Sequence, residues 1–102
     1  IQMNIGLDYD NTYTRDPEAW NDFIDRFQQS GHNVYVVTMR HKQEGKEVEE
    51  ALTKRVDGIF FTGRKGKQKF MFDRGISIDV WIDDMPIFVV QDAASDPVWD
   101  KK

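Results

Sequence analysis

The stretch MNIGLDYDNT, residues 3–12, decides the fold of this chain. Its first five residues form a short apolar run of the length of a buried strand. Asp8 and Asp10 follow with one residue between them, and side chains at that spacing can face the same crevice. Such a pair can hold a divalent cation, or attack phosphorus and shuttle a proton. The alternative is a polar turn that merely follows a strand.

The rest of the chain alternates between apolar runs and helical patterns. Asp16 and Pro17 predict a helix start, because a capping carboxylate followed by proline is typical of a first turn. Strands and helices that alternate at these lengths indicate βαβ units with right-handed crossovers. We therefore expect the α/β class: a single three-layer Rossmann-like domain, with a mostly parallel sheet of four to five strands and helices on both faces. The expected strands are 3–7, 34–37, 59–61 and 78–82, with 87–90 as the candidate fifth, and the expected helices end near Gly31, Gly58 and Gly75.

Composition limits the classes of protein that the chain can represent. Its 102 residues suit one domain over 1–102, with 91–102 as a C-terminal tail. The net charge of -4 argues against strong non-specific nucleic-acid binding. The absence of cysteine excludes disulfides, thiolate metal sites and a cysteine nucleophile. No apolar run approaches the roughly 18 residues that a membrane span needs, and acids interrupt the first one, so we expect a cytoplasmic protein without a membrane partner.

Polar side chains follow two further apolar runs, at the strand ends where open α/β sheets form their sites. Thr38 and Arg40 can bind phosphate oxygens, although, taken by themselves, a strand-end threonine and a solvated arginine are the better explanation. Asp83 and Asp84 are adjacent acids that repel each other, and a bound cation would relieve that repulsion. Oxygen ligands of this kind suit Mg²⁺. The alternative is a pair of aspartates that cap the strand end.

A basic stretch, Arg64 to Lys69, lies before the third expected helix. One lysine of this stretch could neutralise a nucleophilic carboxylate and a transferred phosphoryl group together. Lys67 is the preferred candidate, because its spacing to the apolar residues that follow places it on their side of the helix. Lys65 and Lys69 stay open as alternatives, and the remaining charges are expected to be ordinary surface residues.

Taken in order, these strand-end groups resemble the motifs of the haloacid dehalogenase superfamily of phosphohydrolases. The resemblance spans about residues 3 to 90 and includes the family's first motif, a hydrophobic residue followed by DxDx[TV]. It implies an α/β domain of the minimal type, since the chain leaves no room for a cap domain. The matching residues are Asp8, Asp10 and Thr12 for the first motif, Thr38 for the second, Lys67 or a neighbour for the third, and Asp83 with Asp84 for the fourth.

The resemblance also implies catalytic roles. Asp8 would be the nucleophile that accepts the phosphoryl group, and Asp10 would protonate the leaving group and then activate water. Thr38 and Lys67 would hold the phosphoryl oxygens. An aspartate two residues after the nucleophile distinguishes the family's phosphatases from its dehalogenases, so Asp10 favours a Mg²⁺-dependent phosphomonoesterase.

Metal and substrate contacts follow from the same resemblance. The expected Mg²⁺ ligands are Asp8, Asp10 through its backbone carbonyl, Asp84 directly and Asp83 as a helper. The expected substrate-binding residues are Arg40, Lys65 and Asn11.

The class of substrate is suggested by a shorter resemblance. Residues 38–40, Thr-Met-Arg, resemble the Ser-Gly-Arg segment of polynucleotide kinase 3′-phosphatase domains. Together with the basic stretch Arg64 to Lys69, this favours a nucleotide or a nucleic-acid end over other phosphorylated small molecules. The alternative function is a non-catalytic binding or accessory module with a phosphatase fold.

Overall fold

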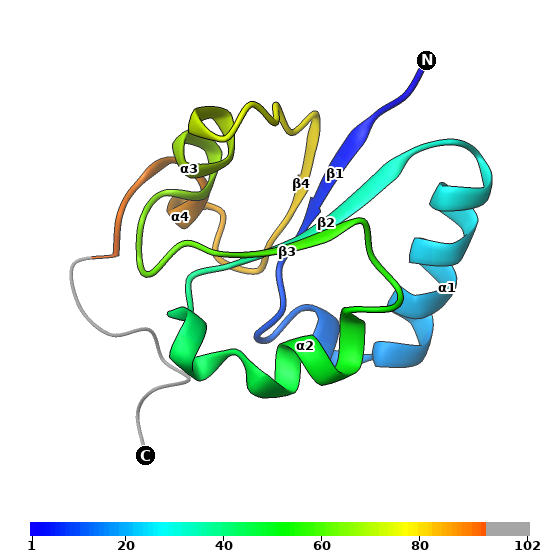
Figure 1. Ribbon diagram of the computed structural model, residues 1–102, viewed down its shortest axis with the longest axis horizontal. Coiled ribbons are helices and arrows are strands. Elements are labelled where there is room, and N and C mark those ends of the chain that lie inside the picture. The colour runs from blue at the N-terminus through cyan, green and yellow to red at the C-terminus, as the bar shows by residue number, and fades with distance from the viewer. Residues whose placement is uncertain (94–102) are drawn as a thin grey trace.

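The computed structural model describes residues 1–93, and residues 94–102 of the expected tail lie outside this range. Within it, four strands form one parallel sheet in the order β3-β2-β1-β4. This confirms the α/β class and the single Rossmann-like domain. Figure 1 shows the strands side by side, with the helices packed around them. The strands are β1 (Asn4–Leu7), β2 (Asn33–Thr38), β3 (Gly58–Phe61) and β4 (Val80–Ile82).

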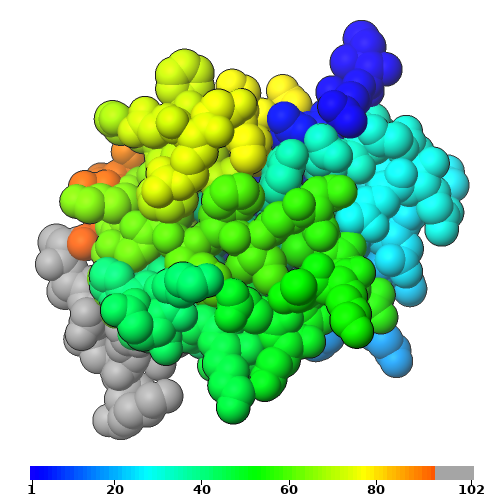
Figure 2. Space-filling model, viewed as in Figure 1, coloured from blue at the N-terminus to red at the C-terminus, as the bar shows by residue number. Residues whose placement is uncertain are grey.

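The crossover helices lie on both faces of the sheet. The helices α1 (Pro17–Gln29) and α2 (Lys46–Leu52) connect β1 to β2 and β2 to β3, and they share one face. The helix α3 (Lys67–Asp73) connects β3 back to β4 across the other face, where it packs against the short helix α4 (Ile87–Val90). This arrangement follows from right-handed crossovers that run in opposite directions along the sheet. In Figure 2, seen from the same side, the yellow-green side chains of the α3 region lie at the upper left and the green side chains of α2 lie along the bottom of the molecule.

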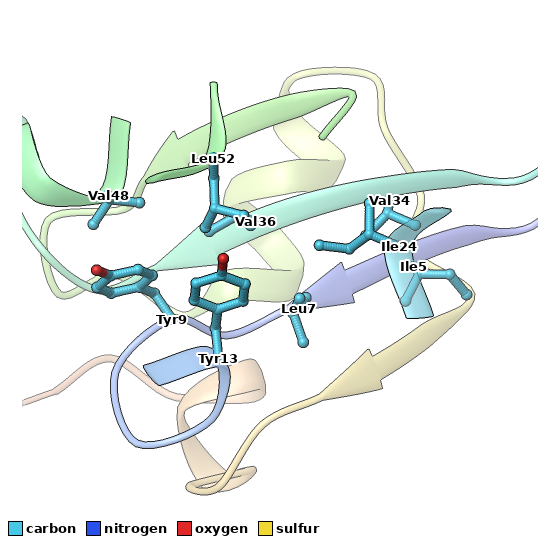
Figure 3. Close-up of a cluster of buried hydrophobic side chains, with 9 residues drawn as sticks. All are labelled: Ile5, Leu7, Tyr9, Tyr13, Ile24, Val34, Val36, Val48 and Leu52. Carbon is cyan, nitrogen blue, oxygen red and sulfur yellow. The ribbon is translucent and has the colours of Figure 1, made fainter. Parts of the chain in front are cut away.

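The main core lies between the sheet and the face that α1 and α2 cover. Alternate strand residues point to this face because the side-chain period of a strand is two. The rings of Tyr9 and Tyr13 stack with their centroids 5.7 Å apart and close the core at the end of β1. Figure 3 shows the nine buried residues of this cluster: Ile5, Leu7, Tyr9, Tyr13, Ile24, Val34, Val36, Val48 and Leu52.

Local sequence signals explain where α1 begins and ends. The Asp16 carboxylate accepts a hydrogen bond from the Ala19 N–H at 3.2 Å, and Pro17 occupies the first helical position. Gly31 follows the helix with a φ of 90°, a left-handed conformation that glycine adopts without a Cβ clash. The predicted start and stop of this helix are therefore confirmed.

Two predicted boundaries are wrong. Residues 87–90 form the helix α4 and not a fifth strand, because Pro86 supplies a helical φ of -60° and the turn buries Val89. An apolar run of four residues does not distinguish a strand from a buried helical turn by its periodicity. Gly58 begins β3 and does not end α2, which stops at Leu52. Among the described residues, no helix is long and apolar enough to cross a membrane.

Candidate active site

The carboxyl ends of the four strands bring the predicted polar residues to one edge of the sheet. The Asp8 N–H donates to the Ile82 carbonyl at 2.9 Å, so Asp8 extends the pairing of β1 with β4. The Thr62 N–H donates to the Thr38 carbonyl at 2.8 Å and extends the pairing of β2 with β3. The parallel register thus places the acid that follows β1 beside the acids that follow β4.

Lys67 lies at the centre of this edge. Its ammonium contacts Asp8 Oδ1 at 2.8 Å and Asp83 Oδ2 at 2.5 Å, and its side chain is only 3% exposed. The other two candidate lysines point away: Lys65 is exposed and 4.0 Å from Asp92, and Lys69 is exposed on α3. Of the three lysines, Lys67 alone contacts the acids at this edge.

Thr12 completes the surroundings of Asp8. Its hydroxyl donates to Asp8 Oδ2 at 3.0 Å and accepts the Asp84 N–H at 3.2 Å. The loop returns to this position because the Tyr13 N–H donates to the Asp8 carbonyl and Asn11 adopts a left-handed φ of 63°. The first acid and the last acidic pair are therefore joined through one threonine side chain.

The three acids Asp8, Asp83 and Asp84 form a compact oxygen cluster. Each offers a carboxylate oxygen, and these oxygens lie within 4.8 Å of one another. Burial raises the pKa of Asp8 to about 7, while the Lys67 ammonium opposes this rise. Asp84 is exposed, so the cluster is reached from solvent. A buried carboxylate, a compensating lysine and an accessible acid together can hold a cation next to a nucleophile.

Asp10 lies on the same loop but contacts a different partner. Both of its carboxylate oxygens accept from the Arg40 guanidinium, at 2.7 and 2.9 Å. Arg40 also donates to the Glu47 carboxylate at 2.7 Å and to the Glu44 carbonyl at 2.6 Å. These contacts raise the pKa of Arg40 above its usual value, with the Asp10 hydrogen bond as the largest cause. Neither glutamate was expected at the site: Glu44 contacts Arg40 through its backbone carbonyl, which any residue offers, and Glu47 reaches it from α2.

The remaining predicted residues lie at different depths. Thr38 is buried, and its hydroxyl accepts the Arg40 N–H at 3.3 Å. Asn11 and Lys65 are exposed, in the loops that follow β1 and β3. The strand-end rule includes Thr62 in the stretch 62–69 where polar groups were expected to collect, but it gave this residue no role of its own. The Thr62 hydroxyl is buried and has no hydrogen-bond partner among the described residues.

The comparisons with known proteins give one relative. A protein from Oceanobacillus iheyensis that carries the provisional name of nucleotidase is 29% identical over 65 residues. The match covers 60% of this chain and 35% of that protein, so the chain spans about a third of the length of the relative that it matches. No protein-family model matches the chain. No solved structure matches it either.

Proposed function

We propose that this domain hydrolyses phosphomonoesters with the help of Mg²⁺, through an aspartyl-phosphate on Asp8. One observation carries this proposal: the Asp8 carboxylate is buried at the strand-end edge between the Lys67 ammonium and the Thr12 hydroxyl, with Asp83 and Asp84 beside it. A structural domain has no need to bury so many like charges together, because desolvating them is unfavourable. The distant relative with a nucleotidase name supports the same class of reaction.

The chemistry proceeds in two transfers. An Asp8 oxygen bonds to phosphorus while the bond from phosphorus to the ester oxygen breaks, and Asp10 gives that oxygen a proton. A water oxygen then bonds to phosphorus, the acyl-phosphate bond breaks, and Asp10 takes up the water proton. Lys67 neutralises the Asp8 carboxylate before the reaction and holds a phosphoryl oxygen during it. Thr38, at the end of the neighbouring strand, is the second residue proposed to hold the phosphoryl group.

The chain offers a set of groups that fits Mg²⁺. The three acids of the cluster offer carboxylate oxygens, and the single charge of Lys67 offsets their negative charge only in part, which favours a divalent cation. The proposed direct ligands are Asp8 and Asp84, with the Asp10 carbonyl as a third and Asp83 as a helper. When bound, Mg²⁺ would offset the negative charge of the phosphoryl oxygens and of the attacking carboxylate.

The proposed substrate is a nucleotide or a phosphorylated nucleic-acid end. The name of the relative points to nucleotides. No additional domain among residues 1–93 covers the acidic edge, so a large ester can reach it.

The experiment is phosphate release from nucleotides, 3′-phosphorylated oligonucleotides, sugar phosphates and p-nitrophenyl phosphate, in Mg²⁺ or in EDTA. We expect release that requires Mg²⁺ and is reduced by at least about 10⁴-fold in Asp8→Asn. The control is Asp22→Asn on the exposed side of α1, which should retain full activity. The proposal would be rejected if Asp8→Asn released phosphate as fast as the wild-type protein. It would also be rejected if a folded wild-type protein that binds Mg²⁺ released no phosphate from any of these substrates.

A further inference from the structure

All three nitrogens of the Arg40 guanidinium donate hydrogen bonds to acceptors of this chain. Nε and Nη2 donate to the two oxygens of Asp10, and Nη1 donates to Glu47 and to the Glu44 carbonyl. The side chain of Arg40 is 9% exposed and that of Asp10 is 12% exposed. The cation is therefore sheltered, and at least four of its five N–H groups already donate inside the protein.

The same arginine is fixed on three sides. Its backbone N–H donates to the Thr38 hydroxyl, and its carbonyl accepts the Gly63 N–H at 3.1 Å. Its guanidinium carbon lies 5.3 Å from the centre of the Tyr9 ring. Glu47 anchors the far side from α2. Arg40 thus links the loops after β1, β2 and β3 to a helix.

The Asp10 carboxylate has no comparable support of its own. Among the described residues, the hydrogen bonds that it accepts all come from Arg40. A bidentate guanidinium fixes the plane of a carboxylate, which a single hydrogen bond or a lysine does not do. Proton transfer requires the carboxylate to lie within hydrogen-bond reach of the departing oxygen. The orientation of Asp10 is therefore set by Arg40.

We infer that Arg40 is a positioning residue that acts through Asp10, and not a residue that binds the substrate. This inference rests on the proposed function. It replaces the substrate-binding role that the sequence suggested for Arg40, and it extends the catalytic unit to Glu47 on α2. Arg40 holds the side chain of Asp10, which enters the first transfer as the carboxylic acid, gives its proton to the leaving oxygen and regains a proton from water in the second transfer, while Lys67 and the acids act on the phosphoryl group.

The test compares kcat/KM for two substrates that differ in leaving group. An alkyl phosphate, such as a nucleoside monophosphate, departs with the help of a proton, whereas p-nitrophenolate departs with little help. Arg40→Ala should reduce kcat/KM for the alkyl ester by on the order of 10²-fold and for p-nitrophenyl phosphate by less than about threefold. Asp10→Asn should show the same leaving-group dependence.

A double-mutant cycle tests whether Arg40 acts through Asp10. If it does, adding Arg40→Ala to Asp10→Asn should change kcat/KM for the alkyl ester by less than about twofold. Arg40→Lys keeps a cation without the bidentate geometry and should lose activity with the same dependence on leaving group. Arg55→Ala is the matched control, because Arg55 forms an exposed ion pair with Asp25 and should leave both substrates unaffected.

The outcomes separate the inference from the proposed function. Equal losses of kcat/KM on both substrates, or additive losses in the double mutant, would overturn the inference and make Arg40 a substrate contact. Activity that survives in Asp8→Asn would instead overturn the proposed function. If Arg40→Ala does not fold, as judged by its thermal unfolding, the Arg40→Lys variant and its cycle with Asp10→Asn decide the question.

Discussion

Asp8 combines a raised pKa with a neighbouring cation. Burial raises the pKa of this carboxyl from 3.8 to about 7, so between these values the folded state keeps a proton that the unfolded chain has lost. A folded state that binds more protons loses stability as pH rises. In EDTA, the contribution of Asp8 to the free energy of unfolding should therefore fall as pH rises through this window.

Thermal unfolding in EDTA at about pH 5 and about pH 8 measures this effect. The wild-type melting temperature should drop more between the two conditions than that of Asp8→Asn, whose side chain does not titrate. A wild-type protein that loses no more stability than the variant would show that the environment of Asp8 does not favour its protonated form.

The Lys67 ammonium offsets part of the repulsion among the acids of the cluster. Replacing it with methionine leaves Asp8 and Asp83 buried without their partner. Breaking a buried ion pair on one side destabilises proteins by about 3–5 kcal/mol. We expect Lys67→Met to lose about 3 kcal/mol in urea unfolding at about pH 8 in EDTA, and Mg²⁺ to restore part of this loss.

Lys69→Met is the matched control for Lys67→Met. Lys69 lies two residues away and forms an exposed ion pair with Asp73 on α3. Its removal should change stability by less than about 0.5 kcal/mol. Similar losses in the two variants would mean that the cluster does not depend on Lys67.

The amino-acid sequence predicted which residues gather at the strand ends. Asp8, Thr38 and Asp83 lie at this edge because polar groups follow apolar runs where parallel strands end, and their proposed roles stay predictions. Which of Lys65, Lys67 and Lys69 faces the acids depends on where α3 begins. A shift of one residue in that start changes the answer, and the sequence does not fix a helix boundary that closely. The contact between Asp10 and Arg40 joins two loops that are 30 residues apart, and no local pattern encodes it.

At the scale of elements, predictions succeeded where the apolar residues were numerous enough to show a helical or a strand period. The long apolar face of α1 and its capping residue gave the right helix, whereas the four apolar residues of α4 were too few to show a period. The sheet ends at β4 among the described residues, so α4 packs on α3 and does not extend the sheet. Tertiary packing, and not local preference, decided that element.

The N-terminal cap of α1 allows a direct test of an element. Asp16→Ala removes the acceptor for the Ala19 N–H and should destabilise the domain by about 1 kcal/mol, with unchanged kcat because the Asp16 carboxylate bonds to Ala19 and, among the described residues, to none of the acids of the edge. Asp22→Ala, on the exposed side of the same helix, should be neutral or slightly stabilising. Urea unfolding of both variants makes the comparison, and equal stabilities would show that the cap contributes nothing.

At the scale of the whole molecule, Mg²⁺ binding should stabilise the folded domain. A ligand that binds only the folded state adds about 2.7 kcal/mol at a concentration 100 times its Kd. The melting temperature of the wild-type protein should therefore rise with Mg²⁺. Asp84→Asn should lose this rise because it removes a proposed ligand from the solvent side of the cluster. A rise that persists in Asp84→Asn would place the bound cation elsewhere.

No further domain among residues 1–93 covers the acidic edge, so in the proposed reaction the short loops at the strand ends would select the substrate. Asn11 and Lys65, in the loops after β1 and β3, are exposed and stay predicted substrate contacts. The chain spans about a third of the length of the relative that carries the nucleotidase name. The proposed reaction therefore concerns this domain and not the whole of that relative.

The central claim is that Asp8 carries the phosphoryl group between the two transfers. Asp10→Asn should slow hydrolysis of this intermediate more than its formation from p-nitrophenyl phosphate, which needs little proton donation. The most direct measurement is mass spectrometry of this variant after an acid quench during turnover with Mg²⁺, followed by digestion to locate the added mass. We predict one added phosphoryl group on Asp8, absent when EDTA replaces Mg²⁺. Steady turnover without any phosphorylated Asp8, or a phosphoryl group on another residue, would contradict the account.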